Sequence, residues 1–136
     1  MNILISVIIP TYGAPKFLEK SIASVLNQTF GDWELIIVDD NNPETDARMA
    51  TEKMVSTFVQ QDHRVKYLKH ARNMNGAVAR NTGFAVAQGK YISLLDSDDE
   101  YMPDRLQECY DAMETAPTSV AGVYTGCEFR RAGKVY

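Results

Sequence analysis

Residues 91–99 read YISLLDSDD, an apolar run that ends in three carboxylates within four residues. Such a run predicts a buried strand, and open α/β sheets bind their ligands just beyond the carboxyl ends of their strands. If the chain stays extended past the strand, the side chains of Asp96 and Asp98 point to the same side of the backbone. Two such carboxylates suit a hard divalent ion, which keeps open coordination positions for phosphate oxygens. The stretch therefore predicts a strand followed by a metal site.

The same acids have a simpler interpretation, in which residues 96–100 form a solvated loop that caps the next helix. Aspartate is common in turns and near helix starts, and Asp99 suits this capping role. A short acidic motif alone is weak evidence for a metal. The rest of the chain has to decide between the two interpretations.

Strand and helix signals alternate along the remaining sequence. Apolar, β-branched runs predict strands, and apolar residues at helical spacing predict helices between them. The expected strands are residues 3–9, 34–38, 64–68, 91–95 and 120–124, and the expected helices are residues 15–26, 44–61, 75–88 and 103–113. Alternation of this kind indicates βαβ units with right-handed crossovers. We expect an α/β fold with a Rossmann-like, mostly parallel sheet that is covered by helices on both faces.

The composition fits one globular domain of 136 residues, with 45% hydrophobic and 24% charged residues. The formal net charge of −4 argues against a nucleic-acid-binding surface, so a bound polyphosphate would need a metal ion or a local arginine. Cys109 and Cys127 match no zinc or disulfide pattern. His63 and His70 match no metal or triad spacing and are interpreted as ordinary exposed histidines.

The sequence contains no recognisable signal peptide and no apolar run of membrane-spanning length, so a cytoplasmic protein is expected. The tail at residues 127–136 reads as a hairpin arm that stops early, which predicts a truncated chain. An uncovered sheet edge in such a fragment would favour self-association into a homodimer.

Polar clusters follow three of the expected strands, at residues 10–12, 39–40 and 96–98. In a parallel sheet the carboxyl ends of all three strands lie along one edge. There, Tyr12 can stack on a planar base, Asp39 or Asp40 can accept a ring N–H, and a bound cation can neutralise a diphosphate. The sequence therefore predicts a nucleoside diphosphate site.

These residues resemble the family 2 glycosyltransferases with the GT-A fold. The resemblance rests on five ordered blocks: residues 7–12 (VIIPTY), 24–30 (SVLNQTF), 34–40 (ELIIVDD), 79–83 (ARNTG) and 89–99 (GKYISLLDSDD). Residues 101–106 (YMPDRL) resemble the helix start that follows the acidic strand end in bacterial enzymes of the spore-coat and surface-polysaccharide type. The chain departs from the family at residues 41–43 (NNP), where Gly-Ser often follows the acids.

The resemblance implies which residues contact a nucleotide-sugar donor. The donor-binding set that it implies is Pro10, Thr11, Tyr12, Asp39, Asp40, Arg80 and Asp96. In this set Thr11 and Tyr12 frame the base, Asp40 with Asp39 reads it, and Asp96 contacts the ribose. Asp98, together with Asp96, is implied to hold Mn²⁺ or Mg²⁺. Arg80 either approaches the donor or forms a structural ion pair with the region of Asp39 or Asp98.

The resemblance also implies an inverting, metal-dependent transfer of a sugar, with a UDP-sugar favoured, to a hydroxyl of a saccharide or glycolipid acceptor. The family's catalytic base belongs to an acceptor half and is expected beyond Tyr136. Residues 1–136 are then the N-terminal, donor-binding part of a GT-A domain. Peripheral contact with the inner face of the membrane, through parts outside this chain, is compatible with this interpretation.

Two alternatives stay open. The first is a nucleotide-binding module without catalysis, or an inactive fragment, which would bind the same ligands without transferring sugar. The second is a phospho-acceptor domain in which Asp39 and Asp40 form the acid pair, although the acids at residues 96–99 fit that function poorly. No Walker, dinucleotide-binding or nucleophile-elbow motif is present.

Overall fold

Strands and helices alternate in the computed structural model, which describes residues 3–13, 15–131 and 134–135. The elements are β1 (Ile5–Thr11), α1 (Leu18–Leu26), β2 (Trp33–Asp39), α2 (Asp46–Gln61), β3 (Val65–Lys69), α3 (Gly76–Val86), β4 (Tyr91–Leu94) and α4 (Arg105–Thr115). The predicted α/β fold and the order of these elements are confirmed. None of the helices in the described part of the chain has the length and apolar character needed to cross a bilayer.

The sheet is parallel, with the strand order β3-β2-β1-β4. The chain first moves outward from β1 to β2 and β3, and then returns to place β4 on the other side of β1. Ile8 of β1 lies opposite both Ile36 of β2 and Leu94 of β4, which fixes the register of these three strands. The order reverses between β1 and β4, and ligands of open α/β sheets bind at such a switch point.

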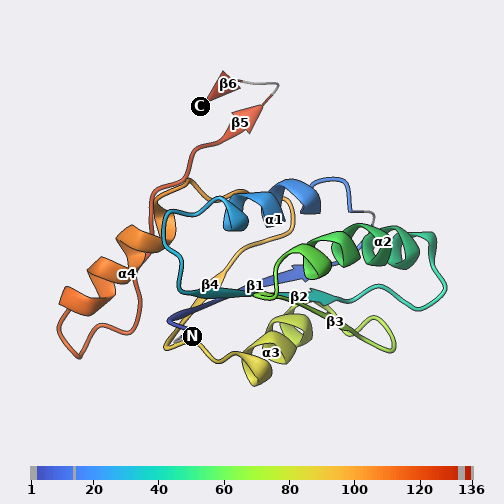
Figure 1. Ribbon diagram of the computed structural model, residues 1–136, viewed down its shortest axis with the longest axis horizontal. Helices are drawn as coiled ribbons and strands as arrows, with labels where there is room; N and C mark the ends of the chain where they lie inside the picture. Colours follow the sequence, from blue (N-terminus) through green and yellow to red (C-terminus); the bar gives the residue numbers. More distant parts are fainter. Residues whose placement is uncertain (1–2, 14, 132–133, 136) are drawn as a thin grey trace.

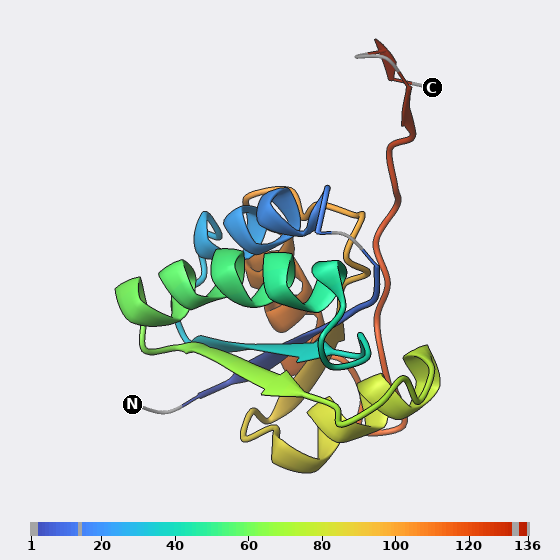
Figure 2. The ribbon, with the colours of Figure 1, turned by 90° about the vertical axis from the view of Figure 1, so that its right-hand side faces the viewer.

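Helices cover both faces of the sheet, as predicted (Figure 1). Figure 2 shows α1 and α2 on one face and α3 on the other. The first face forms the larger core, in which Val7 and Ile37 pack with residues from α1, α2 and α4. The second face is smaller and joins Ile8 and Ile36 to Ala79 of α3. Full burial of each aliphatic side chain contributes about 1.5–3 kcal/mol, so the two cores fix the sheet firmly.

The close packing of α3 on the sheet depends on Gly83, the glycine of the ARNTG block. A Cβ atom at this position would lie 2.5 Å from Cγ2 of Ile8. Any side chain would therefore push α3 away from β1. Because Arg80 lies one turn earlier on the same helix, Gly83 also sets the distance of Arg80 from the carboxyl edge of the sheet.

The prediction of a fifth strand at residues 120–124 is wrong. Val120, Val123 and Tyr124 are exposed, and Tyr124 is 96% exposed. The segment pairs with no described strand, so its apolar side chains are not buried by a neighbouring strand. The predicted hairpin at residues 127–136 is present as the short antiparallel pair β5 (Arg130–Arg131) and β6 (Lys134–Val135), which lies away from the main sheet (Figure 1). Residues 132–133 and 136 of that prediction lie outside the described residues.

Candidate functional site

A cavity of about 450 Å³ lies at the carboxyl ends of β1, β2 and β4. It is lined by Pro10, Thr11, Tyr12, Asp40, Asn73, Asn75, Gly76, Ala79, Arg80, Asp96, Ser97 and Asp98. The fold thus brings three separated sequence blocks together at the predicted edge of the sheet. Of the predicted donor and metal residues, Asp39 alone is not in this lining.

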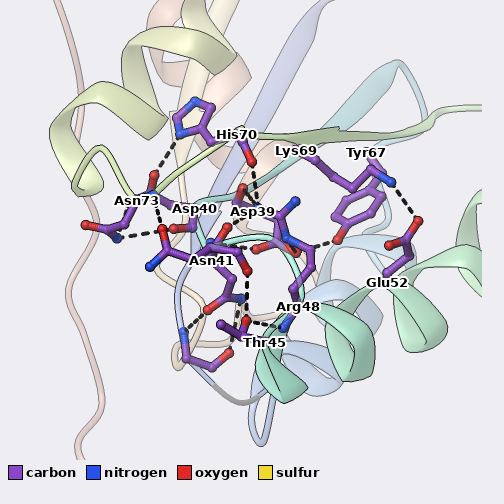
Figure 3. Close-up of polar contacts among 12 residues, drawn as sticks. Asp39, Asp40, Asn41, Thr45, Arg48, Glu52, Tyr67, Lys69, His70 and Asn73 are labelled. Carbon is purple, nitrogen blue, oxygen red and sulfur yellow. Dashed lines mark hydrogen bonds and ion pairs between the residues drawn. The ribbon is translucent and has the colours of Figure 1, made fainter.

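The carboxylates of Asp39 and Asp40 have different surroundings (Figure 3). Asp39 is fully buried, and its Oδ2 accepts a 2.5 Å hydrogen bond from the Tyr67 hydroxyl and lies 3.1 Å from Nε of Arg48. Its Oδ1 accepts a hydrogen bond from the backbone N–H of Asn41 at 2.9 Å. The structure therefore places the Asp39 carboxylate in a structural network rather than at the cavity.

Arg48 of α2 anchors this network, a role that its sequence position did not reveal. Its Nη2 donates to the backbone carbonyls of Asp39 at 3.2 Å, His70 at 2.9 Å and Asn41. The side chain is only 8% exposed. An arginine on a predicted amphipathic helix is expected on the solvent side, and only the tertiary fold shows that this one is buried.

Asp40 lines the cavity and is held by the loop that follows β3. Its Oδ1 accepts hydrogen bonds from Nδ1 of His70 at 2.7 Å and from the backbone N–H of Met74 at 2.8 Å. Its Oδ2 accepts one from Nδ2 of Asn73 at 2.8 Å. These three donors, from one loop, fix the carboxylate in orientation at the wall of the cavity.

The interpretation of His70 as an exposed histidine is wrong, whereas His63 is exposed as expected. His70 is 9% exposed, and its second ring nitrogen, Nε2, lies 2.8 Å from Oγ1 of Thr82 on α3. The imidazole thus links Asp40 to α3. Neither histidine spacing nor local pattern contains a signal for this contact, because its partners lie 30 and 12 residues away.

Arg80 forms an ion pair with Asp96, with 2.5 Å between Nη2 and Oδ1. The partner is thus Asp96 rather than Asp39 or Asp98. The two side chains are 34% and 54% exposed and both line the cavity. Exposed ion pairs contribute about 0–1 kcal/mol, so this guanidinium can be drawn to a ligand at little cost.

The acids after β4 form an exposed loop. Asp98 makes no side-chain hydrogen bond or ion pair with the described residues and lines the cavity. Burial, together with the negative charges of Asp98 and Asp96, raises the pKa of Asp99 above its ordinary value. Asp99 does not cap the next helix, because the N-cap residue of α4 is Asp104. Within the described residues no group of three or more His, Cys, Asp or Glu side chains could hold a metal ion.

The turn after β1 brings an aromatic ring to the cavity. Tyr12 is 67% exposed, which leaves its ring open to stacking. Gly13 follows with φ of +82°, a conformation that favours glycine. Its N–H donates to Oδ1 of Asn41 at 2.8 Å, and its carbonyl accepts from Nδ2 of Asn41 at 3.3 Å. The departure from the family at residues 41–43 therefore supplies a link between the ends of β1 and β2.

Sequence reasoning missed five residues of the cavity wall: Asn73, Asn75, Gly76, Ala79 and Ser97. Asn75 had a usable signal, since asparagine at a helix start predicts an N-cap. Its side chain accepts hydrogen bonds from the N–H groups of Ala77 and Val78, and its φ is +75°. Asn73 had none, because its contact with Asp40 spans 33 residues.

Solved structures share this fold. S. aureus TarS in complex with UDP-GlcNAc matches with a TM-score of 0.72 and 26% identity, over 82% of this chain and 31% of that chain. A mannosyltransferase from Pyrobaculum calidifontis in complex with GDP-Man and Mn²⁺ matches with a TM-score of 0.69 and 22% identity, over 87% of this chain and 34% of that chain. The second likeness shows the fold alone.

Curated relatives are glycosyltransferases. The chain is 38% identical over 104 residues to the UDP-Glc:alpha-D-GlcNAc-diphosphoundecaprenol beta-1,3-glucosyltransferase of Escherichia coli, covering 76% of this chain and 38% of that protein. It is 36% identical over 110 residues to a Bacillus subtilis glycosyltransferase named for teichuronic acid biosynthesis, covering 81% and 42%. The chain thus spans about two fifths of the length of these relatives. The family model of glycosyl transferase family 2 matches residues 6–132, and the chain belongs to that family.

Proposed function

We propose that this chain supplies the donor-binding part of a glycosyltransferase that moves a sugar from a nucleotide-diphosphate donor to an acceptor hydroxyl. One observation carries the proposal: Tyr12, Asp40, Asp96 and Asp98 come from three separate strand ends and line one cavity. The cavity, at about 450 Å³, is of the size typical of small-molecule sites. The proposal is supported by the relatives, whose names describe sugar transfer.

The cavity offers distinct chemistry for each part of the donor. The open ring of Tyr12 can stack on the base, and the fixed carboxylate of Asp40 can accept a ring N–H. Arg80 can pair with a phosphate, since its present partner is a partly exposed carboxylate. A uracil base is favoured because TarS, at 26% identity, is described with UDP-GlcNAc. Asp39 is left out of the donor-binding set because its carboxylate is committed to Arg48 and Tyr67.

The acidic loop fits a divalent ion that arrives with the diphosphate. The carboxylate of Asp98 lines the cavity and has no partner among the described residues. The pKa of Asp99 is raised by burial and by the negative charges of Asp98 and Asp96. Two carboxylates without a third ligand suit Mn²⁺ or Mg²⁺, whose other positions are commonly filled by phosphate oxygens and water. When bound, such an ion would neutralise charge on the leaving diphosphate.

In the proposed reaction the acceptor oxygen attacks the anomeric carbon as the bond to the diphosphate breaks, with inversion. The residues of this chain hold the leaving group: Tyr12 and Asp40 at the base, Arg80 at the phosphates, and Asp96 and Asp98 at the ribose and the ion. We assign the general base that removes the acceptor proton to a part of the protein outside residues 1–136. Removal of a positioned base lowers rates by about 10²–10⁴-fold, so this chain alone is expected to bind donor but transfer sugar poorly.

The acceptor is proposed to be a saccharide or a glycolipid. This part of the proposal is supported by the E. coli relative, which is named for a diphosphoundecaprenol acceptor. An acceptor anchored in a bilayer would place the active protein at the membrane surface. The described helices contain no membrane-spanning candidate, so that contact would be peripheral or lie outside these residues.

Calorimetric titration with UDP, GDP and TDP, each with and without Mn²⁺, tests the proposal. We expect UDP to bind more tightly with Mn²⁺ than without it, and Asp98→Ala to remove that difference. The matched control is Asp32→Ala, which changes an exposed aspartate at the amino end of β2, the opposite end of the sheet. The control should keep the full effect of Mn²⁺.

Absence of nucleotide binding by the folded chain would overturn the proposal. Equal affinity for UDP in the presence and absence of Mn²⁺ would show that the metal part of the proposal is wrong. A longer chain that includes the rest of the protein should then transfer sugar from the nucleotide that binds best. Binding without transfer by that longer chain would favour a nucleotide-binding module instead.

A further inference from the structure

The acidic loop, residues 96–100, is closed at its base by the hydroxyl of Tyr101. It begins after β4 and ends at Tyr101, whose hydroxyl donates to the backbone carbonyl of Leu94 at 2.6 Å. Leu94 is the last residue of β4, so this bond joins the two ends of the loop. On the other side of the strand, the N–H of Leu95 donates to the carbonyl of Ile8 in β1 at 3.1 Å. The end of β4 is thus held from both sides immediately before Asp96.

The hydroxyl of Tyr101 belongs to a chain of hydrogen bonds. Its oxygen lies 2.7 Å from Oγ of Ser93, which accepts a hydrogen bond from Nη1 of Arg105 at 3.1 Å. Because the only hydroxyl proton of Tyr101 goes to Leu94, Ser93 donates to Tyr101. Burial raises the pKa of Tyr101, which keeps this proton in place. The guanidinium of Arg105 also lies over the Tyr101 ring, 4.0 Å from its centroid, so the ring is fixed from two directions.

The base of the loop is also held by Ser24 of α1 and by Gln28, which follows α1. These contacts join two sequence blocks that do not line the donor cavity. The backbone N–H of Tyr101 donates to Oγ of Ser24 at 3.0 Å. Next to it, Nε2 of Gln28 donates to the carbonyl of Met102 at 2.7 Å, and Oε1 of Gln28 accepts from the N–H of Leu106 at 2.9 Å. The SVLNQTF and YMPDRL blocks therefore meet at the foot of the acidic loop.

Within the loop, little besides the backbone determines where Asp98 lies. The N–H of Asp99 donates to the carbonyl of Asp96 at 3.1 Å, and Asp96 is paired with Arg80. The carboxylate of Asp98 has no such partner among the described residues. Its position must follow from how the two ends of the loop are joined.

We propose that Tyr101 is a positioning residue, whose hydroxyl closes the base of the acidic loop and thereby holds Asp98 ready for a divalent ion and a nucleotide diphosphate. This inference rests on the function proposed above. It assigns Tyr101 an effect on the ion-dependent part of binding only. The base-binding end of the cavity, at Tyr12 and Asp40, does not depend on this hydrogen bond.

The test compares Tyr101→Phe with Tyr91→Phe by titration of UDP with and without Mn²⁺. Both substitutions remove one hydroxyl, but that of Tyr91 bonds Glu114 at the far end of β4. Tyr101→Phe should keep the metal-free affinity within about twofold and lose roughly five- to tenfold of the gain from Mn²⁺, because the hydrogen bonds of the hydroxyl with Leu94 and Ser93 are lost. Tyr91→Phe should keep both affinities.

Hydrogen exchange gives a second readout that needs no ligand. In Tyr101→Phe the amides of residues 95–100 should exchange faster than in the unmodified chain, while those of β1 and β2 should not change. If Tyr101→Phe does not fold, Ser93→Ala breaks the same chain of hydrogen bonds without touching the ring. It should show the same two effects at smaller size.

Several results would overturn the inference. They are a full Mn²⁺ effect in Tyr101→Phe, an equal loss of affinity with and without Mn²⁺, and unchanged exchange in the loop. If the unmodified chain binds no UDP at all, the proposed function fails and the ligand role of Tyr101 fails with it. The exchange data would then still show, separately, whether the hydroxyl closes the loop.

Discussion

Replacement of Asp39 by asparagine should destabilise the protein without weakening nucleotide binding by the folded molecule. Both carboxylate oxygens of Asp39 face donors: Tyr67 and Arg48 at Oδ2, and the backbone N–H of Asn41 at Oδ1. An amide has one oxygen, so in either orientation its NH₂ group meets a donor. The substitution also leaves the buried guanidinium of Arg48 without a counter-charge.

The size of the effect follows from burial. Asp39 is fully buried and the Arg48 side chain is 8% exposed, and breaking a buried ion pair by changing one partner costs about 3–5 kcal/mol. Domains of this size are stable by about 5–15 kcal/mol in total, so the loss is a large fraction. At about 3–4 °C per kcal/mol, the melting temperature should fall by roughly 10–20 °C. Urea unfolding and thermal melting measure these quantities.

Two comparisons make the test decisive. Glu52→Gln breaks the exposed ion pair with Lys69, in which the side chains are 46% and 44% exposed, and should shift the melting temperature by only about 2 °C. Asp40→Asn should also destabilise the chain, but it alone should weaken UDP binding at a temperature where all variants are folded. A melting temperature of Asp39→Asn equal to that of the unmodified chain would refute the energetic argument. A loss of UDP affinity in folded Asp39→Asn would show that this carboxylate contacts the donor.

Three further predictions concern other parts of the chain. Burial alone would raise the pKa of Glu34, but hydrogen bonds from Lys66 and other donors lower this pKa below the ordinary 4.5. The ionised Glu34 side chain therefore contributes fully to stability above pH 4.5, and this contribution is lost as the pH falls further. Urea unfolding should therefore show that the difference in stability between the unmodified chain and Glu34→Gln narrows in acid, and a constant difference would contradict the shift. A cation at the acidic loop should lower the raised pKa of Asp99, so Mn²⁺ binding should release protons in the acid range above the ordinary aspartate pKa. This release is measured as binding heats that depend on the buffer, and heats independent of the buffer would exclude it. Gln28→Ala leaves the N–H of Leu106 without its acceptor and should cost about 1–3 kcal/mol in urea unfolding, whereas an unchanged unfolding curve would show that this link is dispensable.

The parts of the structure that follow from local pattern could be predicted from the sequence. Strand and helix periodicity gave the order of the elements, and the rule that ligands bind at the carboxyl edge placed Tyr12, Asp40, Asp96 and Asp98 together. The pattern failed at residues 120–124, where an apolar run pairs with none of the strands that the structure describes. Strand formation depends on a partner, which a local window of sequence does not contain.

The same limit explains the residues of the site that were missed. Arg48 and His70 are polar residues with ordinary local surroundings, and each becomes buried only because a distant segment supplies its partners. The contact between Asn73 and Asp40 spans 33 residues in the same way. Single-sequence reasoning finds groups that carry chemistry at strand ends, but not the groups that hold them in place.

The different roles of Asp39 and Asp40 follow from the central position of β2. Asp39 is in register with Thr11 of β1 and Lys69 of β3, and the hydrogen bonding continues one residue further, from the N–H of Asp40 to the carbonyl of Thr11 at 2.9 Å. With both neighbouring strands fixing the register, adjacent side chains must take different directions. One acid therefore lies against α2 and stabilises the edge of the sheet, while the next lies at the cavity. Sequence analysis placed both of these neighbouring, identical residues in the donor-binding set. In the structure Asp39 has a structural role and Asp40 is positioned for the proposed binding role, and a shift of one residue would exchange them.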